Sequence, residues 1–111
     1  MNAEREADDA PAPSIHLSSP FTLVNRTLWF GKIALYEDQI VLSGWSWTGY
    51  VKTTIPFDRI HFVAKWTVQE GPNVEIHRKG DAPILGRIEK GAGLWEQELR
   101  KEGRIELKLR H

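Results

Sequence analysis

The chain has 111 residues, of which 41% are hydrophobic and 27% charged, an ordinary composition for a single globular domain. Fifteen basic residues balance fifteen acidic ones, so the net charge provides no attraction for nucleic acid. The absence of cysteine excludes disulfide bonds, Cys-ligated zinc and iron–sulfur clusters. Because no apolar run approaches the roughly 20 residues of a transmembrane helix and no signal peptide is recognisable, we expect a cytoplasmic protein without a transmembrane segment.

Residues 1–14 are small, acidic and proline-bearing, with four acidic residues against one arginine. Such a segment cannot bury enough apolar surface to offset the entropy lost on ordering, so we expect a disordered acidic tail. Ordered structure is expected to begin between Ile15 and Phe21. Pro20 disfavours a helix through this stretch, although a short turn or helical start after Ser18 and Ser19 stays open.

Between residues 28 and 88, apolar side chains recur mostly at every second position, which is typical of strands with one buried face. Turn-forming residues separate these runs at 37–38, 48–49, 70–73 and 80–81. The pattern therefore predicts a series of short antiparallel strands.

The periodicity changes after Gly91. Ala92, Trp95 and Leu99 follow at i, i+3 and i+7, which predicts an amphipathic helix with Gly103 as its C-cap. Residues 104–111 then alternate again, so they read as a strand-like extension. The predicted fold class is mainly β (α+β): a strongly bent antiparallel sheet or barrel of about seven strands, capped by one C-terminal helix, with the domain over residues 15–103.

Two short segments resemble the pleckstrin-homology-like domains of the bacterial PH or GRAM kind. Residues 31–42 (Gly-Lys-Ile-Ala-Leu-Tyr-Glu-Asp-Gln-Ile-Val-Leu) resemble the first hairpin of that group, and residues 55–60 (Ile-Pro-Phe-Asp-Arg-Ile) are similar to the corner before its next strand. The resemblance implies a seven-stranded bent sheet closed at one end by the helix. It also implies a binding or scaffolding module rather than an enzyme, because members bind lipids, peptides, partner domains or themselves.

The resemblance does not extend to phosphoinositide recognition. Members that bind these headgroups carry a basic cluster on and after the first strand. Here the hairpin turn holds Glu37 and Asp38, and only Arg26 and Lys32 lie upstream. We therefore do not expect a phosphoinositide headgroup among the partners.

The five tryptophans are the unusual feature of the composition. Trp66 and Trp95 are expected to fill the core, whereas Trp29 is unassigned. Trp45 and Trp47 share one strand face near the turn that precedes Tyr50. These three side chains predict an exposed aromatic surface for a peptide or a second subunit, since Trp and Tyr concentrate in binding hot spots.

The C-terminal extension supplies a second predicted interface. Ile105, Leu107 and Leu109 form an apolar face that must be buried, either on the chain's own sheet or against a neighbouring chain. Strand addition across subunits would give a homo-oligomer, so these three residues join the candidate partner-binding set.

No motif indicates catalysis, a metal or a cofactor. The four histidines (His16, His61, His77 and His111) lack metal-ligand spacing, and no Ser-His-Asp order or paired carboxylates stand out. We therefore expect a non-catalytic binding or scaffold module that associates with a protein or with itself through sheet edges and an aromatic surface. The alternative is a small apolar ligand or lipid held in the barrel mouth, between helix and sheet.

Overall fold

The computed structural model describes residues 15–24 and 28–110. Residues 1–14, for which a disordered tail is expected, and the C-terminal His111 lie outside the described residues. In chain order, the elements are β1 (Ile15–Leu23), β2 (Trp29–Tyr36), β3 (Gln39–Ser46), β4 (Gly49–Pro56), η1 (Phe57–Arg59), β5 (Ile60–Trp66), β6 (Val74–Arg78), β7 (Ile84–Ile88), α2 (Ala92–Lys101) and β8 (Leu107–Arg110).

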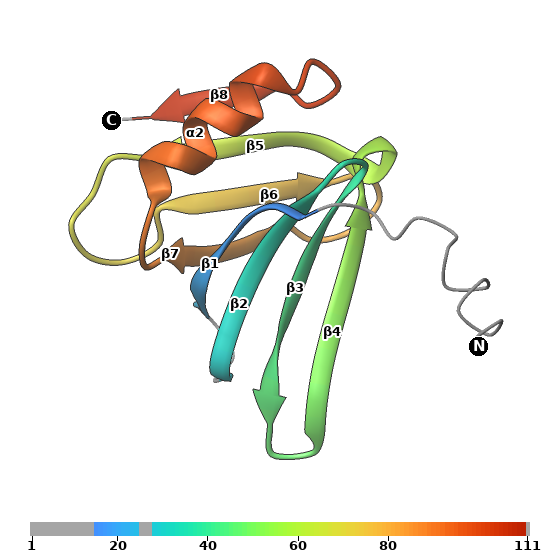
Figure 1. Cartoon of the computed structure of the whole chain (residues 1–111), viewed down its shortest axis with the longest axis vertical. Coiled ribbons are helices and arrows are strands. Elements are labelled where there is room, and N and C mark those ends of the chain that lie inside the picture. The colour runs from blue at the N-terminus through green and yellow to red at the C-terminus, as the bar shows by residue number, and fades with distance from the viewer. Residues whose placement is uncertain (1–14, 25–27, 111) are drawn as a thin grey trace, which may run out of the picture.

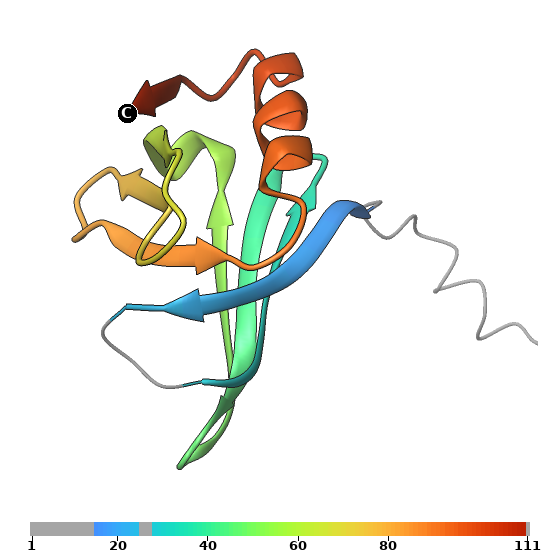
Figure 2. The same ribbon diagram turned by 90° about the vertical axis from the view of Figure 1, so that its left-hand side faces the viewer.

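The eight strands form one bent sheet in the order β4-β3-β2-β1-β7-β6-β5-β8 (Figure 1). Neighbouring strands are antiparallel except β8, which runs parallel to β5. β1 joins the two halves: residues 15–20 pair with β2 and residues 21–23 with β7. Figure 2 shows the resulting bend from the side. The predicted fold class is confirmed, with a sheet that is bent but not closed.

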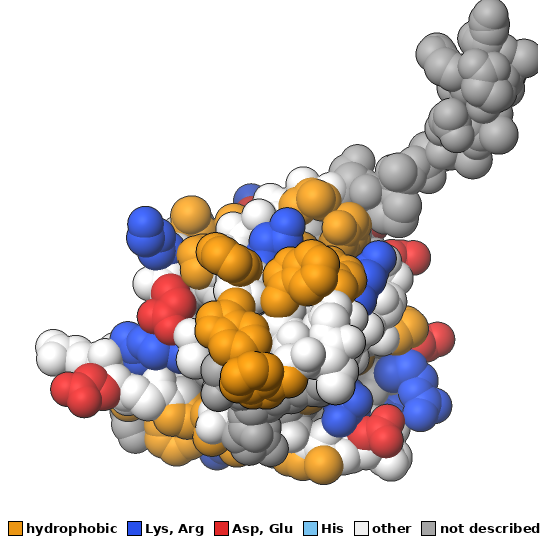
Figure 3. Space-filling view, turned by 90° about the horizontal axis from the view of Figure 1, so that it is seen from below, with side chains coloured by type: hydrophobic (Ala, Val, Ile, Leu, Met, Phe, Trp, Pro, Cys, Tyr) orange, Lys and Arg blue, Asp and Glu red, His pale blue; other side chains and the backbone are white. Residues whose placement is uncertain are grey.

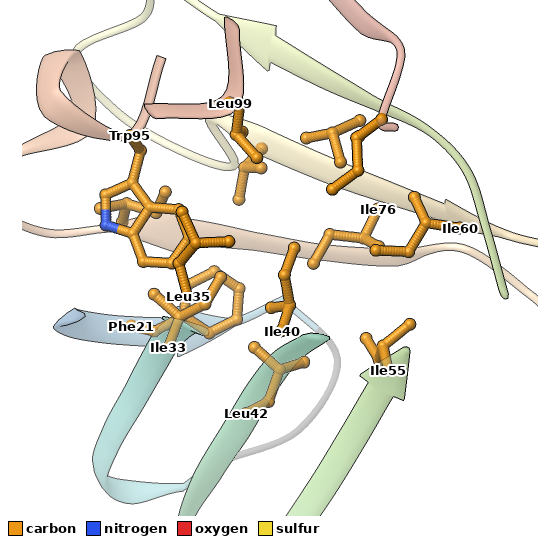
Figure 4. Close-up of a cluster of buried hydrophobic side chains, with 14 of the residues drawn as sticks. Phe21, Ile33, Leu35, Ile40, Leu42, Ile55, Ile60, Ile76, Trp95 and Leu99 are labelled. Atoms are coloured by element: carbon orange, nitrogen blue, oxygen red, sulfur yellow. The ribbon is translucent and has the colours of Figure 1, made fainter. Parts of the chain in front are cut away.

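Helix α2 packs over one end of the bend, as its apolar spacing predicts. Trp95, only 1% exposed, and Leu99 point from the helix toward Phe21 and Leu35 (Figure 4). The Trp95 indole Nε1 donates a hydrogen bond to Ser19 Oγ at 2.9 Å. The assignment of Gly103 as the C-cap is wrong: Glu102 is the cap, and its N–H bonds to the carbonyls of Glu98 and Leu99.

The core assignment of Trp66 is also wrong. Val63 points inward from β5 and is 1% exposed, so Trp66, an odd number of residues away, lies on the opposite face. There the indole Nε1 of Trp66 is half-buried and donates to Glu75 Oε2 at 2.8 Å. Alternation established that the strand has two faces, but it did not establish which face the rest of the chain covers.

Asn73 extends the pairing between β6 and β7 beyond the backbone ladder. Its side-chain Oδ1 accepts from the Ile88 N–H at 2.8 Å, and its Nδ2 donates to the Ile88 carbonyl at 3.1 Å. The residue is buried, so water cannot replace these bonds. A single amide thus satisfies both backbone groups of Ile88, just before the chain leaves the sheet for α2.

Lys65 is buried on the same strand as Val63, with 5% of its surface exposed. Burial lowers the pKa of its ammonium group because a charged group loses hydration in the interior. Glu96 of α2 opposes this effect, whereas Arg87 adds to it. Desolvation thus disfavours the charged form of this lysine in the folded chain.

Replacing Asn73 with alanine should destabilise the fold by about 2–4 kcal/mol, because it leaves the buried N–H and carbonyl of Ile88 without partners. Urea unfolding followed by circular dichroism measures this loss. The exposed Gln69→Ala variant serves as the control and should change the free energy of unfolding by less than about 0.5 kcal/mol. Equal effects of the two substitutions would contradict the bonding role of Asn73.

Lys65→Met should be at least as stable as the wild type at pH 7, with a gain on the order of 1 kcal/mol. Between the lowered folded-state pKa and the ordinary value of 10.5, the unfolded wild-type chain binds more protons than the folded one. Wild-type stability therefore rises with pH in this window, and the advantage of Lys65→Met shrinks. Urea unfolding across this range, with exposed Lys79→Met as control, tests the effect; parallel profiles for wild type and Lys65→Met would disprove it.

Candidate binding surface

Aromatic side chains gather at the end of the molecule farthest from α2. We call these five residues the aromatic patch: Trp29, Phe30, Trp45, Trp47 and Tyr50. Phe30 and Trp47 are 90% and 88% exposed, and the other three are 44–56% exposed. Viewed from below, the molecule shows hydrophobic side chains clustered at this end (Figure 3). The structure thus exposes Trp45, Trp47 and Tyr50, the three aromatic residues singled out from sequence.

The patch is built on a row across three strands. Trp45 of β3 lies opposite Trp29 of β2 on one side and opposite Tyr50 of β4 on the other. Opposite residues of antiparallel strands share a face, so the three rings stand on the outer face of the sheet. Trp45 meets Tyr50 edge-on at 5.3 Å between ring centroids. Trp47, in the turn between β3 and β4, contacts the Trp29 ring edge-on at 5.4 Å between ring centroids. Trp47 is therefore part of the patch.

Phe30 owes its exposure to a β-bulge. The register between β2 and β3 shifts between Trp29 and Lys32, and Phe30 adopts φ 56°, a left-handed conformation that is strained for an aromatic residue. The neighbouring Gly31 is required because a Cβ there would lie 2.2 Å from the Phe21 carbonyl oxygen. Strain at a fully exposed aromatic residue is a feature more typical of a functional site than of packing.

Trp29 and Phe30 were not assigned from sequence. Period-two alternation fails at a bulge, because the extra residue shifts every later side chain to the other face. The glycine of the Trp-Phe-Gly run that begins β2 was the available signal, since glycine in a strand often marks a bulge.

A row of lysines follows the aromatic row on the same face. Lys32 of β2, Ser43 of β3 and Lys52 of β4 are opposite one another in register. Both lysines are exposed, and residues 28–36 and 39–56 contain no acidic side chain. The outer face of β2–β4 therefore presents aromatic rings at its tip and positive charge directly behind them.

The predicted interface residues of the C-terminal extension lie elsewhere. β8 pairs with β5 of its own chain, and Leu107 stands opposite Val63. Ile105 is 5% exposed and belongs to the core, with Leu107 packed against it; Leu109 is 41% exposed. The sequence left two alternatives for this apolar face: burial on the chain's own sheet or against a neighbouring chain. In the structure, Ile105 and Leu107 pack on the chain's own sheet, so they are not available to a partner.

The outer face of β5 and β6 carries a cluster of aromatic and charged groups. Glu75 accepts hydrogen bonds from Trp66 and His77, and the bond to His77, at 2.9 Å, lowers the pKa of this carboxyl. The His77 ring stacks on the Phe62 ring, with 4.1 Å between the ring centroids. Lys108 Nζ lies 4.1 Å from the centroid of the Phe62 ring. The Lys108 contact adds to the backbone pairing that attaches β8 to β5. His61 and His77 are not brought into a metal site, since the described residues hold no group of three or more His, Asp or Glu side chains able to bind one.

A pocket of about 310 Å³ opens between the two halves of the bent sheet. Apolar side chains from β1, β3, β4 and β7 line it, together with Thr53 and Arg78. No residue of α2 contributes, so this pocket differs in position from the expected one between helix and sheet. The side chain of Arg78 donates two hydrogen bonds to the Ala82 carbonyl at its rim.

The sequence matches no protein-family model, and no curated protein is significantly similar to it. In the described part of the chain, the helices are too short or too polar to cross a bilayer. The function must therefore be argued from the surface itself.

Relieving the strain at Phe30 should stabilise the fold. Asparagine tolerates the left-handed conformation far better than phenylalanine, so Phe30→Asn should unfold at a higher temperature, with a gain of about 1 kcal/mol. Phe30→Leu, which also removes the ring but keeps the strain, is the matched control and should show no such gain. If both variants melt together, the strain at residue 30 is not significant. Differential scanning calorimetry makes the comparison.

Proposed function

We propose that this chain is a non-catalytic binding module whose aromatic patch associates with a protein surface, a second copy of the chain included. The observation that carries the proposal is the nearly complete exposure of Phe30 and Trp47 beside three further aromatic residues. Exposure of these apolar rings to water is unfavourable in free energy. A partner that covered the rings would remove that apolar surface from water, and this burial would stabilise the complex.

The size of the patch supports a protein partner. An aromatic side chain offers about 150–250 Å² when fully exposed, so the exposed fractions of the five residues correspond to roughly 500–800 Å². The largest apolar patch of a typical monomer is about 300–600 Å². A stable interface buries about 800 Å² on each partner. The patch with its surrounding polar rim reaches that size.

The resemblance to bacterial PH-like or GRAM-like domains supports the same class of function. The bent sheet, with a C-terminal helix packed over one end, agrees with what the resemblance implies. Binding modules of that kind need no reaction chemistry. The patch supplies exposed aromatic rings, with two lysines on the same sheet face, which suits association with another surface.

The pocket between the sheet halves favours a second candidate, the binding of a small apolar ligand. Its volume lies at the lower end of the range of ligand sites, and its lining is mostly aliphatic with two polar groups, Thr53 and Arg78. The pocket and the patch use different residues, so the two functions can be separated experimentally.

Self-association should depend on Trp47. Native mass spectrometry and light scattering, from micromolar to millimolar protein, should show oligomers for the wild type and monomers for Trp47→Ser, because the substitution removes the exposed ring of the turn between β3 and β4. Leu94→Ser is the matched control: Leu94 is also an exposed apolar residue, but it lies on α2, so this variant should associate like the wild type.

A wild type that stays monomeric throughout, or a Trp47→Ser variant that associates normally, would contradict the use of the patch in self-association. The same spectra address the second candidate. A small added mass retained by Trp47→Ser would indicate a ligand in the pocket.

A further inference from the structure

The lysine row and the aromatic row together describe the chemistry of the occupant. The two rows are two residues apart along β3, at Ser43 and Trp45, which corresponds to roughly 7 Å. A segment with acidic side chains followed at this distance by groups that pack on aromatic rings would complement both rows. Proline is such a group, and extended proline-bearing segments are bound by aromatic-lined surfaces in several recognition domains.

The chain itself contains a segment of this kind. Residues 1–14 hold Glu4, Glu6, Asp8 and Asp9, followed by Pro11 and Pro13. In an extended polyproline conformation the rise is about 3.1 Å per residue, so Asp9 and Pro11 would be roughly 6 Å apart. This spacing matches the distance between the two rows. Proline also restricts the free chain, which reduces the entropy lost on binding.

We propose that the aromatic patch and the lysine row bind residues 1–14 of a second copy of the chain. This inference rests on the proposed function, since it names the partner of the same surface. Pro11 and Pro13 would pack on the rings of Trp45, Tyr50 and Trp47. Asp8 and Asp9 would pair with Lys32 and Lys52.

Chain length determines that the segment comes from a different copy. Ile15 lies opposite Tyr36, at the far end of β2 from Trp29, so the aromatic row is seven residues or roughly 23 Å away. Pro13 can lie at most about 7 Å, and Pro11 about 14 Å, from Ile15. Neither proline reaches the patch of its own chain. The contact therefore joins two copies of the chain: reciprocal exchange of the segments closes a two-fold dimer, and one-way exchange generates rings or open chains of subunits.

The test uses two full-length variants. The patch variant is Trp47→Ser. The segment variant combines Asp8→Asn, Asp9→Asn, Pro11→Ala and Pro13→Ala. Each alone should associate at least about tenfold more weakly than the wild type, because each lacks one side of the contact. Mixed together, they should form a one-to-one heterodimer, since the mixture still holds one intact patch and one intact segment. Native mass spectrometry distinguishes the two chains by mass.

Charge is tested separately. Lys52→Gln should weaken wild-type association and reduce its dependence on salt, whereas Lys79→Gln, an exposed lysine between β6 and β7, should do neither. Circular dichroism and unchanged melting temperatures verify that all variants fold.

Three results would overturn the inference. If the segment variant associates like the wild type while Trp47→Ser does not, the patch binds another part of the second copy, and the proposed function survives without this inference. If the segment variant sediments with vesicles of phosphatidylserine and phosphatidylcholine, and Trp47→Ser abolishes that sedimentation, a lipid surface is the occupant. A mixture that yields no heterodimer contradicts the contact between the segment of one copy and the patch of another.

Discussion

The fold depends on the passage of β1 from one half of the sheet to the other at Phe21. Both neighbouring strands approach so closely there that side chains are excluded: a Cβ at Gly31 would lie 2.2 Å from the Phe21 carbonyl oxygen, and one at Gly86 would lie 2.3 Å from the Phe21 ring. The two glycines allow three strands to meet at the bend, where the Phe21 ring enters the core. The same constraint reaches the surface, since Gly31 is part of the bulge that turns Phe30 outward. Core packing and the aromatic patch are thus consequences of one crossing.

Aromatic residues are buried at one end of the molecule and exposed at the other. At one end, α2 covers the open side of the bend, and Trp95 finds both apolar neighbours and a hydrogen-bond partner in Ser19. At the other end, β2, β3 and β4 extend beyond the second half of the sheet (Figure 1), and none of the described strands or helices covers the outer face of their tips. Trp29, Trp45 and Tyr50 stand there in register, and the Trp47 ring contacts Trp29. The exposure is therefore a result of topology rather than of weak packing.

Sequence patterns predicted the elements better than their surroundings. Period-two alternation and turn residues located the strands, and the spacing of Ala92, Trp95 and Leu99 located the helix, because both signals are local. The expectations for Trp66, Ile105 and Leu107 depended on which surfaces the rest of the chain covers. That information is non-local: Val63 and Leu107 are 44 positions apart in the chain yet opposite in the sheet. Phe30 was missed because a bulge breaks the alternation, and the pocket because it forms only where two sheet halves diverge.

The neutral net charge conceals a separation of charge along the chain. Residues 1–14 hold four acidic side chains against one arginine, whereas residues 28–36 and 39–56 hold two lysines and no acid. A chain with the same composition but mixed charges would give its outer sheet face no electrostatic preference. Here the lysine row gives the face a positive potential at short range, while screening at physiological ionic strength, with a Debye length of about 8 Å, limits the reach of the charges elsewhere on the molecule. The electrostatic character of this surface therefore depends on the register of Lys32 and Lys52 beside the aromatic rings, and not on net charge.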